Sequence, residues 1–167
     1  MAHPYEERCQ EPPLQAGPAT DRVGSVSDSV AARHLAEILE ALSAHDLDRV
    51  AAVVDEKFEF EDVGGGETAH GRDEWREFCA KFVTAFPDLS QDVRLLVDGG
   101  EYAFAEVVAR GTHTGPLATP EGDVPPTGRT IEVPFCVLVR AREGLLSEGR
   151  EYYDALSLLG QLGLTPS

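Results

Sequence analysis

Positive charge, cysteine and long apolar runs are all scarce in this chain of 167 residues. Lysine and arginine together number 14 against 30 acidic residues, which gives a formal net charge of −16. Nucleic acids and anionic membranes are bound through cationic patches, so this balance argues against both as partners. The acids are scattered along the sequence, so the charge alone does not indicate a cationic substrate.

The three cysteines, Cys9, Cys79 and Cys136, are odd in number and widely spaced. This pattern argues against a disulfide framework and against a zinc site, and it fits a reducing cytoplasm. No apolar run is long enough to span a membrane, and the N-terminus lacks the apolar core of a signal peptide. We therefore expect a cytoplasmic protein with no metal and no membrane contact.

The short motifs of several enzyme classes are also missing. There is no H-E-x-x-H, no P-loop, no G-x-G-x-x-G after a strand and no G-x-S-x-G. Metal-dependent hydrolysis, nucleotide binding and serine hydrolysis therefore rank low.

The sequence divides into a tail and one domain. Residues 1–28 hold four prolines with glycine, serine and charge, and they show no apolar period, so we expect a disordered tail. Residues 29–164 are long enough to bury a core as a single domain.

Apolar spacing in the domain predicts helices first and strands afterwards. Helices are expected over 31–42, from Leu47 behind an Asp46 cap, after Gly71 up to Pro87, and at the C-terminus. Strands are expected at 58–63, 89–97, 102–114, 129–142 and 144–154. The order indicates an α+β fold in which a curved, mostly antiparallel sheet wraps around N-terminal helices as a cone. Such a cone has an open mouth suited to a ligand.

The last strand carries two different faces. Glu148, Arg150, Tyr152 and Asp154 share one face, and Ser147, Gly149, Glu151 and Tyr153 share the other. An acid, a guanidinium, a phenol and a second acid in register form either a salt-bridged outer surface or the polar floor of a pocket. The position of this strand, just before an apolar C-terminal segment, favours the pocket.

Several motifs resemble the SnoaL-like polyketide cyclase family of the nuclear transport factor 2-like and ketosteroid isomerase-like superfamily. They are Phe86-Pro87-Asp88-Leu89, Gly111-Thr112-His113-Thr114-Gly115, Pro125-Pro126-Thr127-Gly128-Arg129, and Arg150-Glu151-Tyr152-Tyr153-Asp154 followed by Leu158-Leu159-Gly160-Gln161-Leu162-Gly163. The resemblance covers roughly residues 29–164. The tail is extra, residues 116–124 look like a longer loop than usual, and Leu145-Leu146 stands where a basic residue followed by Ile is common.

This resemblance implies a cofactor-independent cyclase that closes a ring of a small, hydrophobic polyketide-like substrate by an aldol reaction. It places the acid/base carboxylate at Asp154. Other activities of the same cone are an isomerase of the ketosteroid type, a dehydratase and an epoxide hydrolase, and a further alternative is a non-catalytic binding module.

Three more residues join Asp154 as catalytic candidates. Arg150 could tune the carboxylate or bind an oxygen, Tyr152 could donate to an enolate, and His113 could transfer or position a proton. The alternatives are a salt bridge or helix cap for Asp154, structural pairing for Arg150, packing for Tyr152 and a loop anchor for His113.

The expected substrate-binding residues are Asp62, Trp75, Phe60 and Glu106. Asp62 ends a strand before three glycines and could point into the mouth, and Glu106 is an acid on an aromatic face. The alternative for Trp75 is the helical core, and for Glu106 it is pairing at the surface.

Two further expectations concern access and assembly. Residues 116–124 show no strand or helix period, so we expect a mobile lid over the pocket. Apolar residues on both faces of adjacent strands, such as Tyr102 and Phe104 opposite Ala103 and Ala105, lead us to expect a homodimer through the outer face of the sheet.

Overall fold

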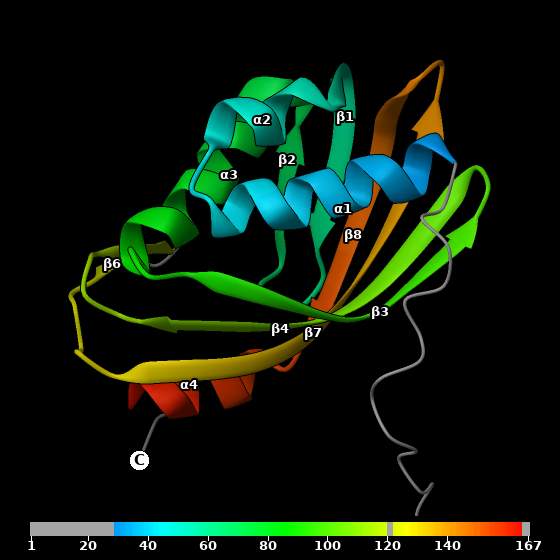
Figure 1. Cartoon of the computed structure of the whole chain (residues 1–167). Coiled ribbons are helices and arrows are strands. Elements are labelled where there is room, and N and C mark those ends of the chain that lie inside the picture. Colours follow the sequence, from blue (N-terminus) through cyan, green and yellow to red (C-terminus); the bar gives the residue numbers. More distant parts are fainter. Residues whose placement is uncertain (1–28, 120–121, 165–167) are drawn as a thin grey trace, which may run out of the picture.

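The computed structural model describes residues 29–119 and 122–164, and the expected tail at 1–28 lies outside them. The described chain is an α+β cone in which a curved, unclosed sheet wraps around helices (Figure 1). The helices are α1 (Val30–Ser43), α2 (Leu47–Ala52), α3 (Gly71–Ala85) and α4 (Ala155–Leu162). The strands are β1 (Val54–Asp62), β2 (Glu67–His70), β3 (Ser90–Gly99), β4 (Tyr102–Thr112), β5 (Leu117–Thr119), β6 (Gly122–Val124), β7 (Thr130–Arg142) and β8 (Leu145–Tyr153).

Six strands form the main sheet in the order β2-β1-β8-β7-β4-β3. All neighbouring pairs are antiparallel except β1 and β8, which run parallel with Asp62 opposite Glu151. The β7–β8 hairpin turns at Glu143 and Gly144, whose φ angles of 52° and 88° are the positive values that a tight hairpin turn requires. The expected mostly antiparallel sheet is confirmed, and β1–β8 is its one parallel pair among the described strands.

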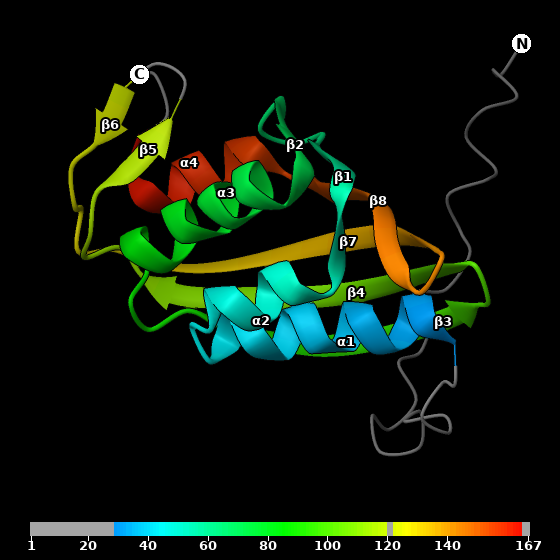
Figure 2. The same cartoon turned by 90° about the horizontal axis from the view of Figure 1, so that it is seen from above.

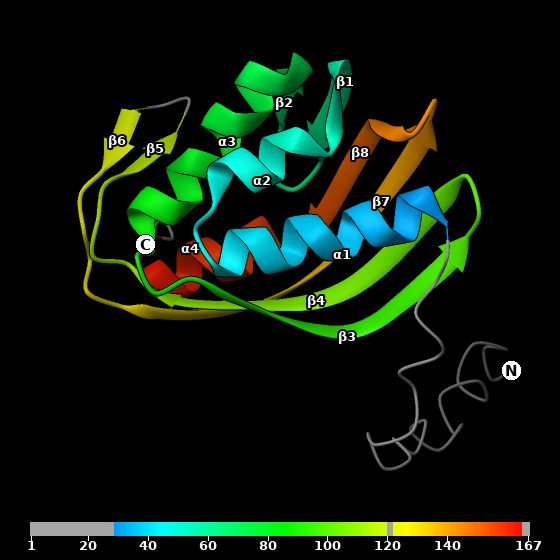
Figure 3. The ribbon, with the colours of Figure 1, turned by 45° about the horizontal axis from the view of Figure 1, so that its top comes forward.

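The helices form where the apolar spacing predicts them. Ser29 caps α1 by accepting from the amide of Ala32 at 3.2 Å, and Asp46 caps α2 by accepting from Arg49 at 3.0 Å. Both α1 and α3 lie on the concave side of the sheet, as the views in Figures 2 and 3 agree. Within the described residues, no helix is long and apolar enough to cross a membrane.

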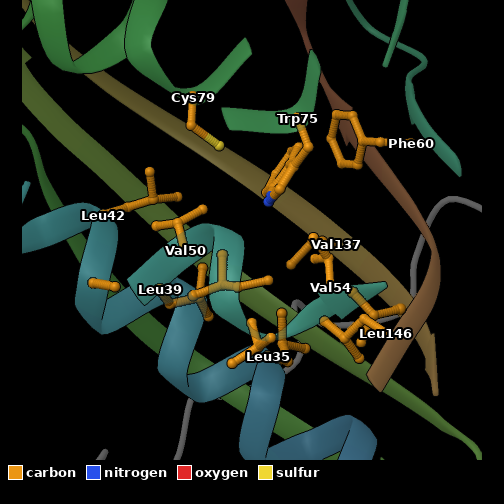
Figure 4. Packing of buried hydrophobic residues seen from close by; sticks show 14 of the residues in the cluster. Leu35, Leu39, Leu42, Val50, Val54, Phe60, Trp75, Cys79, Val137 and Leu146 are labelled. Atoms are coloured by element: carbon orange, nitrogen blue, oxygen red, sulfur yellow. The ribbon is translucent and has the colours of Figure 1, made fainter. Parts of the chain in front are cut away.

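The main core lies between the helices and the concave face (Figure 4). The apolar residues of α1 meet Phe58 and Phe60 of β1 and the inner residues of β4 and β7, and the buried Trp75 and Phe78 of α3 complete the cluster. A second cluster around Phe86, Ile131 and Leu162 holds α4 against β7. Beyond the end of β8, Gln161 of α4 accepts from the amide of Glu132 at 2.7 Å and donates to its carbonyl at 3.1 Å, so it continues the pairing of β7.

Two features differ from the expectations. Residues 67–70 form β2, a short strand that pairs with β1. Residues 117–119 and 122–124 pair as the small antiparallel hairpin β5–β6, where we expected a loop without strands. Leu117 is 8% exposed and packs in the second cluster, so the start of this hairpin belongs to the core.

Candidate functional site

Two adjoining cavities occupy the inside of the cone. The first contains about 690 Å³ of empty space, including the part open to solvent, and lies between α3, α4 and strands β3, β4, β7 and β8. The second contains about 390 Å³ and extends under α1. Five residues border both cavities: Leu42, Trp75, Gln91, Phe135 and Glu151. The remaining lining is almost wholly aliphatic and aromatic.

Among the described residues that line these cavities, Glu151 of β8 is the one with a carboxyl group. The surrounding apolar side chains desolvate it, and the nearby carboxylate of Asp62 repels its charge, so its pKa is raised to about 8. A carboxyl with this pKa is mostly protonated at neutral pH, with a minor ionised fraction. It can therefore act both as an acid and as a base near the pH of a cell.

Asp62 and Tyr153 form a hydrogen-bonded pair near Glu151. The Tyr153 hydroxyl donates to Asp62 Oδ2 at 3.1 Å, and the amide of Gly65 donates to Oδ1 at 2.7 Å. Asp62 is only 2% exposed, and burial raises its pKa in spite of these hydrogen bonds. A Cβ on Gly64 would lie 2.7 Å from the Tyr153 ring, so glycine there allows the turn to close over the phenol. Tyr153 lines the first cavity, and Asp62 lies behind it.

The face of β8 that we expected to be the pocket floor is the outer face. Arg150 forms an ion pair with Glu61 at 3.0 Å, and both side chains are about half exposed. Tyr152 is 47% exposed on the same face. The inner face is the one with Glu151 and Tyr153, because both residues line the first cavity. Arg150 and Tyr152 are therefore surface residues and do not reach the cavities.

Asp154 also lies outside the cavities. It is exposed and caps α4, with Oδ1 accepting from the amide of Ser157 at 3.0 Å. The expectation that this carboxylate lies inside the cone is corrected, because β8 ends at Tyr153 and the chain turns into α4 at this residue. The helix-cap alternative is the one that the structure shows.

His113 is fully buried and anchors a loop. Its Nδ1 lies 3.1 Å from the Thr127 hydroxyl and accepts from the Thr127 amide at 3.3 Å, and its ring packs on Phe86 with centroids 5.3 Å apart. Burial lowers its pKa, which favours the neutral ring. It belongs to neither cavity lining, so its contacts are those of the loop anchor.

Of the four expected substrate-binding residues, some line the cavities and others do not. Trp75 borders both cavities and Phe60 lines the second, whereas Asp62 stands behind Tyr153. Glu106 is exposed on the outer face of β4, opposite Cys136 of β7. Of the four, Trp75 and Phe60 line the cavities, and Asp62 and Glu106 do not.

The residues missed were Glu151, Tyr153 and Gln91. A signal for the first two was present, since they share a face with Ser147 and Gly149, and small residues accompany a closely packed face. A Cβ on Gly149 would lie 2.9 Å from the Phe58 ring, so only glycine fits where β1 and β8 meet. Gln91 stands in register with Leu89 and Val93 in the alternation of residues 89–97, and this one polar residue in an apolar register was assigned no role.

The fold and the site define a cone-shaped α+β protein with an apolar pocket around one carboxyl. Residues 30–162 match the model of the SnoaL-like polyketide cyclase family, and the chain belongs to that family. The comparison with curated proteins found no match.

Solved structures of the same fold include a protein from Jannaschia described as a candidate SnoaL-like polyketide cyclase. It has a TM-score of 0.72 and 18% identity, over 86% of this chain and 97% of the other. IdmH from Streptomyces antibioticus, described as a candidate polyketide cyclase, is 27% identical with a TM-score of 0.64, over 78% and 96%. An epoxide hydrolase of the LEH-like type from M. tuberculosis has a TM-score of 0.61 and 16% identity, over 80% and 89%.

Proposed function

We propose that the chain is a cofactor-independent cyclase of polyketide biosynthesis and that Glu151 is its acid/base. One observation carries the proposal: a single carboxyl with a pKa near 8 borders both apolar cavities of the cone. Membership of the SnoaL-like family supports the reaction class. The apolar lining supports a hydrophobic, polyketide-like substrate.

The reaction uses the two protonation states of Glu151 in turn. The ionised carboxylate takes a proton from the carbon next to a substrate carbonyl and leaves an enolate. The enolate carbon then attacks a second carbonyl carbon of the same molecule, which forms the ring bond and places the negative charge on oxygen. Glu151, now a carboxylic acid, returns its proton to that oxygen. The step needs no other reactant.

The proton-abstraction step can be tested without the natural substrate. β-Tetralone is a flat, neutral ketone with acidic protons next to its carbonyl, and the exchange of those protons in deuterium oxide can be followed by NMR. We expect the protein to accelerate the exchange. Glu151→Gln should lower the protein-dependent rate by about 10²–10⁴-fold, the usual contribution of a general base.

Glu148→Gln is the matched control, because it makes the same change on the outer face of the same strand. It should leave the rate unchanged. A Glu151→Gln variant that binds β-naphthol normally and still exchanges at the full rate would show that another group is the base. Absence of exchange in the unchanged protein, with ligand binding intact, would favour the binding module.

A further inference from the structure

Two buried polar atoms without a partner lie among the residues that border both cavities. Within the described residues, neither Trp75 Nε1 nor Gln91 Oε1 has a hydrogen-bond partner. Trp75 is 5% exposed. An indole N–H can only donate and the carboxamide oxygen only accepts, so together they offer both halves of a hydrogen-bonding site.

The position of the indole is fixed by its neighbours. Its ring centroid lies 4.5 Å from that of Phe60, 5.5 Å from Phe58 and 5.8 Å from Phe78. In Figure 4 the nitrogen of Trp75 points away from Phe60 and into the space between the helices and the sheet. The N–H is therefore held toward the inside of the cone.

Gln91 is fixed from its backbone. The backbone amide of Gln91 donates to the Ser43 hydroxyl at 3.0 Å. That hydroxyl in turn donates to the backbone carbonyl of Leu39 at 3.1 Å. These bonds tie β3 to the end of α1. Gln91 pairs with Ala109 of β4, which also lines the first cavity, so its side chain emerges on the concave face.

Leaving such groups unpaired is unfavourable. A buried donor or acceptor without a partner has lost its hydrogen bonds to water, and a ligand group that pairs with it recovers part of that cost. Charge sets a second condition. Among the described residues that line the two cavities there is no lysine, arginine or histidine, whereas Glu151 is an acid. An anion would enter this apolar space without a countercharge.

We propose that Trp75 Nε1 and Gln91 Oε1 form a hydrogen-bonding subsite that holds the oxygen of an uncharged, mostly apolar ligand next to Glu151. The subsite selects a ligand with an oxygen acceptor for Trp75 and a hydroxyl or N–H donor for Gln91. The subsite's role in the reaction rests on the proposed function. A ligand oxygen held there would place the carbon next to it at the carboxyl of Glu151. The binding itself does not depend on that reaction.

Four naphthalene probes that cannot undergo the exchange reaction test the subsite. β-Naphthol offers a donor and an acceptor, β-naphthyl methyl ether only an acceptor, naphthalene neither, and β-naphthoate a negative charge. Binding is followed through the fluorescence of the naphthalene ring at neutral pH. We expect the ether to bind more tightly than naphthalene and naphthol more tightly still, with about tenfold gained for each buried hydrogen bond. β-Naphthoate should bind most weakly.

Two variants test which protein atom is responsible for each gain in affinity. Trp75→Phe keeps an aromatic ring but removes the N–H, so it should reduce binding of the ether to that of naphthalene. Gln91→Leu should reduce binding of naphthol to that of the ether and leave the ether unchanged. Tyr152→Phe, on the outer face, is the control and should change nothing.

The proposal is overturned if naphthalene, ether and naphthol bind equally to the unchanged protein, or if β-naphthoate binds best. These results stand even if Trp75→Phe fails to fold, because the ligand series is read in the unchanged protein. Loss of exchange on β-tetralone with the naphthol preference intact would contradict the proposed function alone.

Discussion

Asp154 shows how one acid can resemble a catalytic group and serve as a helix cap. Asparagine caps a helix about as well as aspartate, whereas alanine costs about 1 kcal/mol. We therefore predict that Asp154→Asn keeps both the thermal stability and the exchange rate on β-tetralone. Asp154→Ala should lower the melting temperature by a few degrees. Thermal unfolding and the exchange assay on both variants provide the check, and a large loss of rate in Asp154→Asn would restore this residue as the base.

The hairpin β5–β6 is tied to the core through Leu117. We predict that Leu117→Ala lowers the free energy of unfolding by about 2–3 kcal/mol, because a truncated core leucine leaves a cavity. Leu156→Ala is the matched control, since Leu156 is 69% exposed and its loss should be nearly neutral. Denaturant titrations measure both. Equal, small effects would show that the hairpin packs loosely and would support the expectation of a mobile lid.

At the scale of the whole molecule, the outer face of the sheet carries apolar side chains that no described element covers. On β3, β4 and β8 they include Leu95, 36% exposed, Val97, 46%, Tyr102, 41%, and Tyr152, 47%. We propose that this face joins two copies of the chain. Light scattering should give the mass of a dimer, with dissociation favoured at low salt because each copy carries a charge of −16. A monomer mass at every salt concentration would contradict this interface.

The parts of the fold that depend on local pattern were predictable. Apolar spacing located α1 and α3, and alternation located most strands of the sheet, because these signals lie within one segment. Which face of β8 points into the cone could not be predicted in this way. Alternation separates Glu151 from Arg150, but only packing against Phe58 and Phe60, which are remote in sequence, decides which face is inside.

The sequence therefore predicted part of the cavity lining and not which carboxyl faces the cavities. Trp75 and Asp62 come from segments whose burial the sequence indicated. The expected position of Asp154 inside the cone was wrong because a carboxylate one residue beyond the end of a strand follows the next element, and here that element is α4. The unpartnered atoms of Trp75 and Gln91 depend on the shape of the cavities, which no local pattern records.

The central claim is that Glu151 exchanges protons with a ligand inside the cone, and its pH dependence tests that claim most directly. Exchange on β-tetralone needs the ionised carboxylate, so the protein-dependent rate should rise with pH and level off above the pKa. Because burial raises this pKa from 4.5 to about 8, the midpoint of the rise should lie near pH 8, and Glu151→Gln should abolish it. A midpoint near the ordinary value of 4.5, or a rise that persists in Glu151→Gln, would contradict the account.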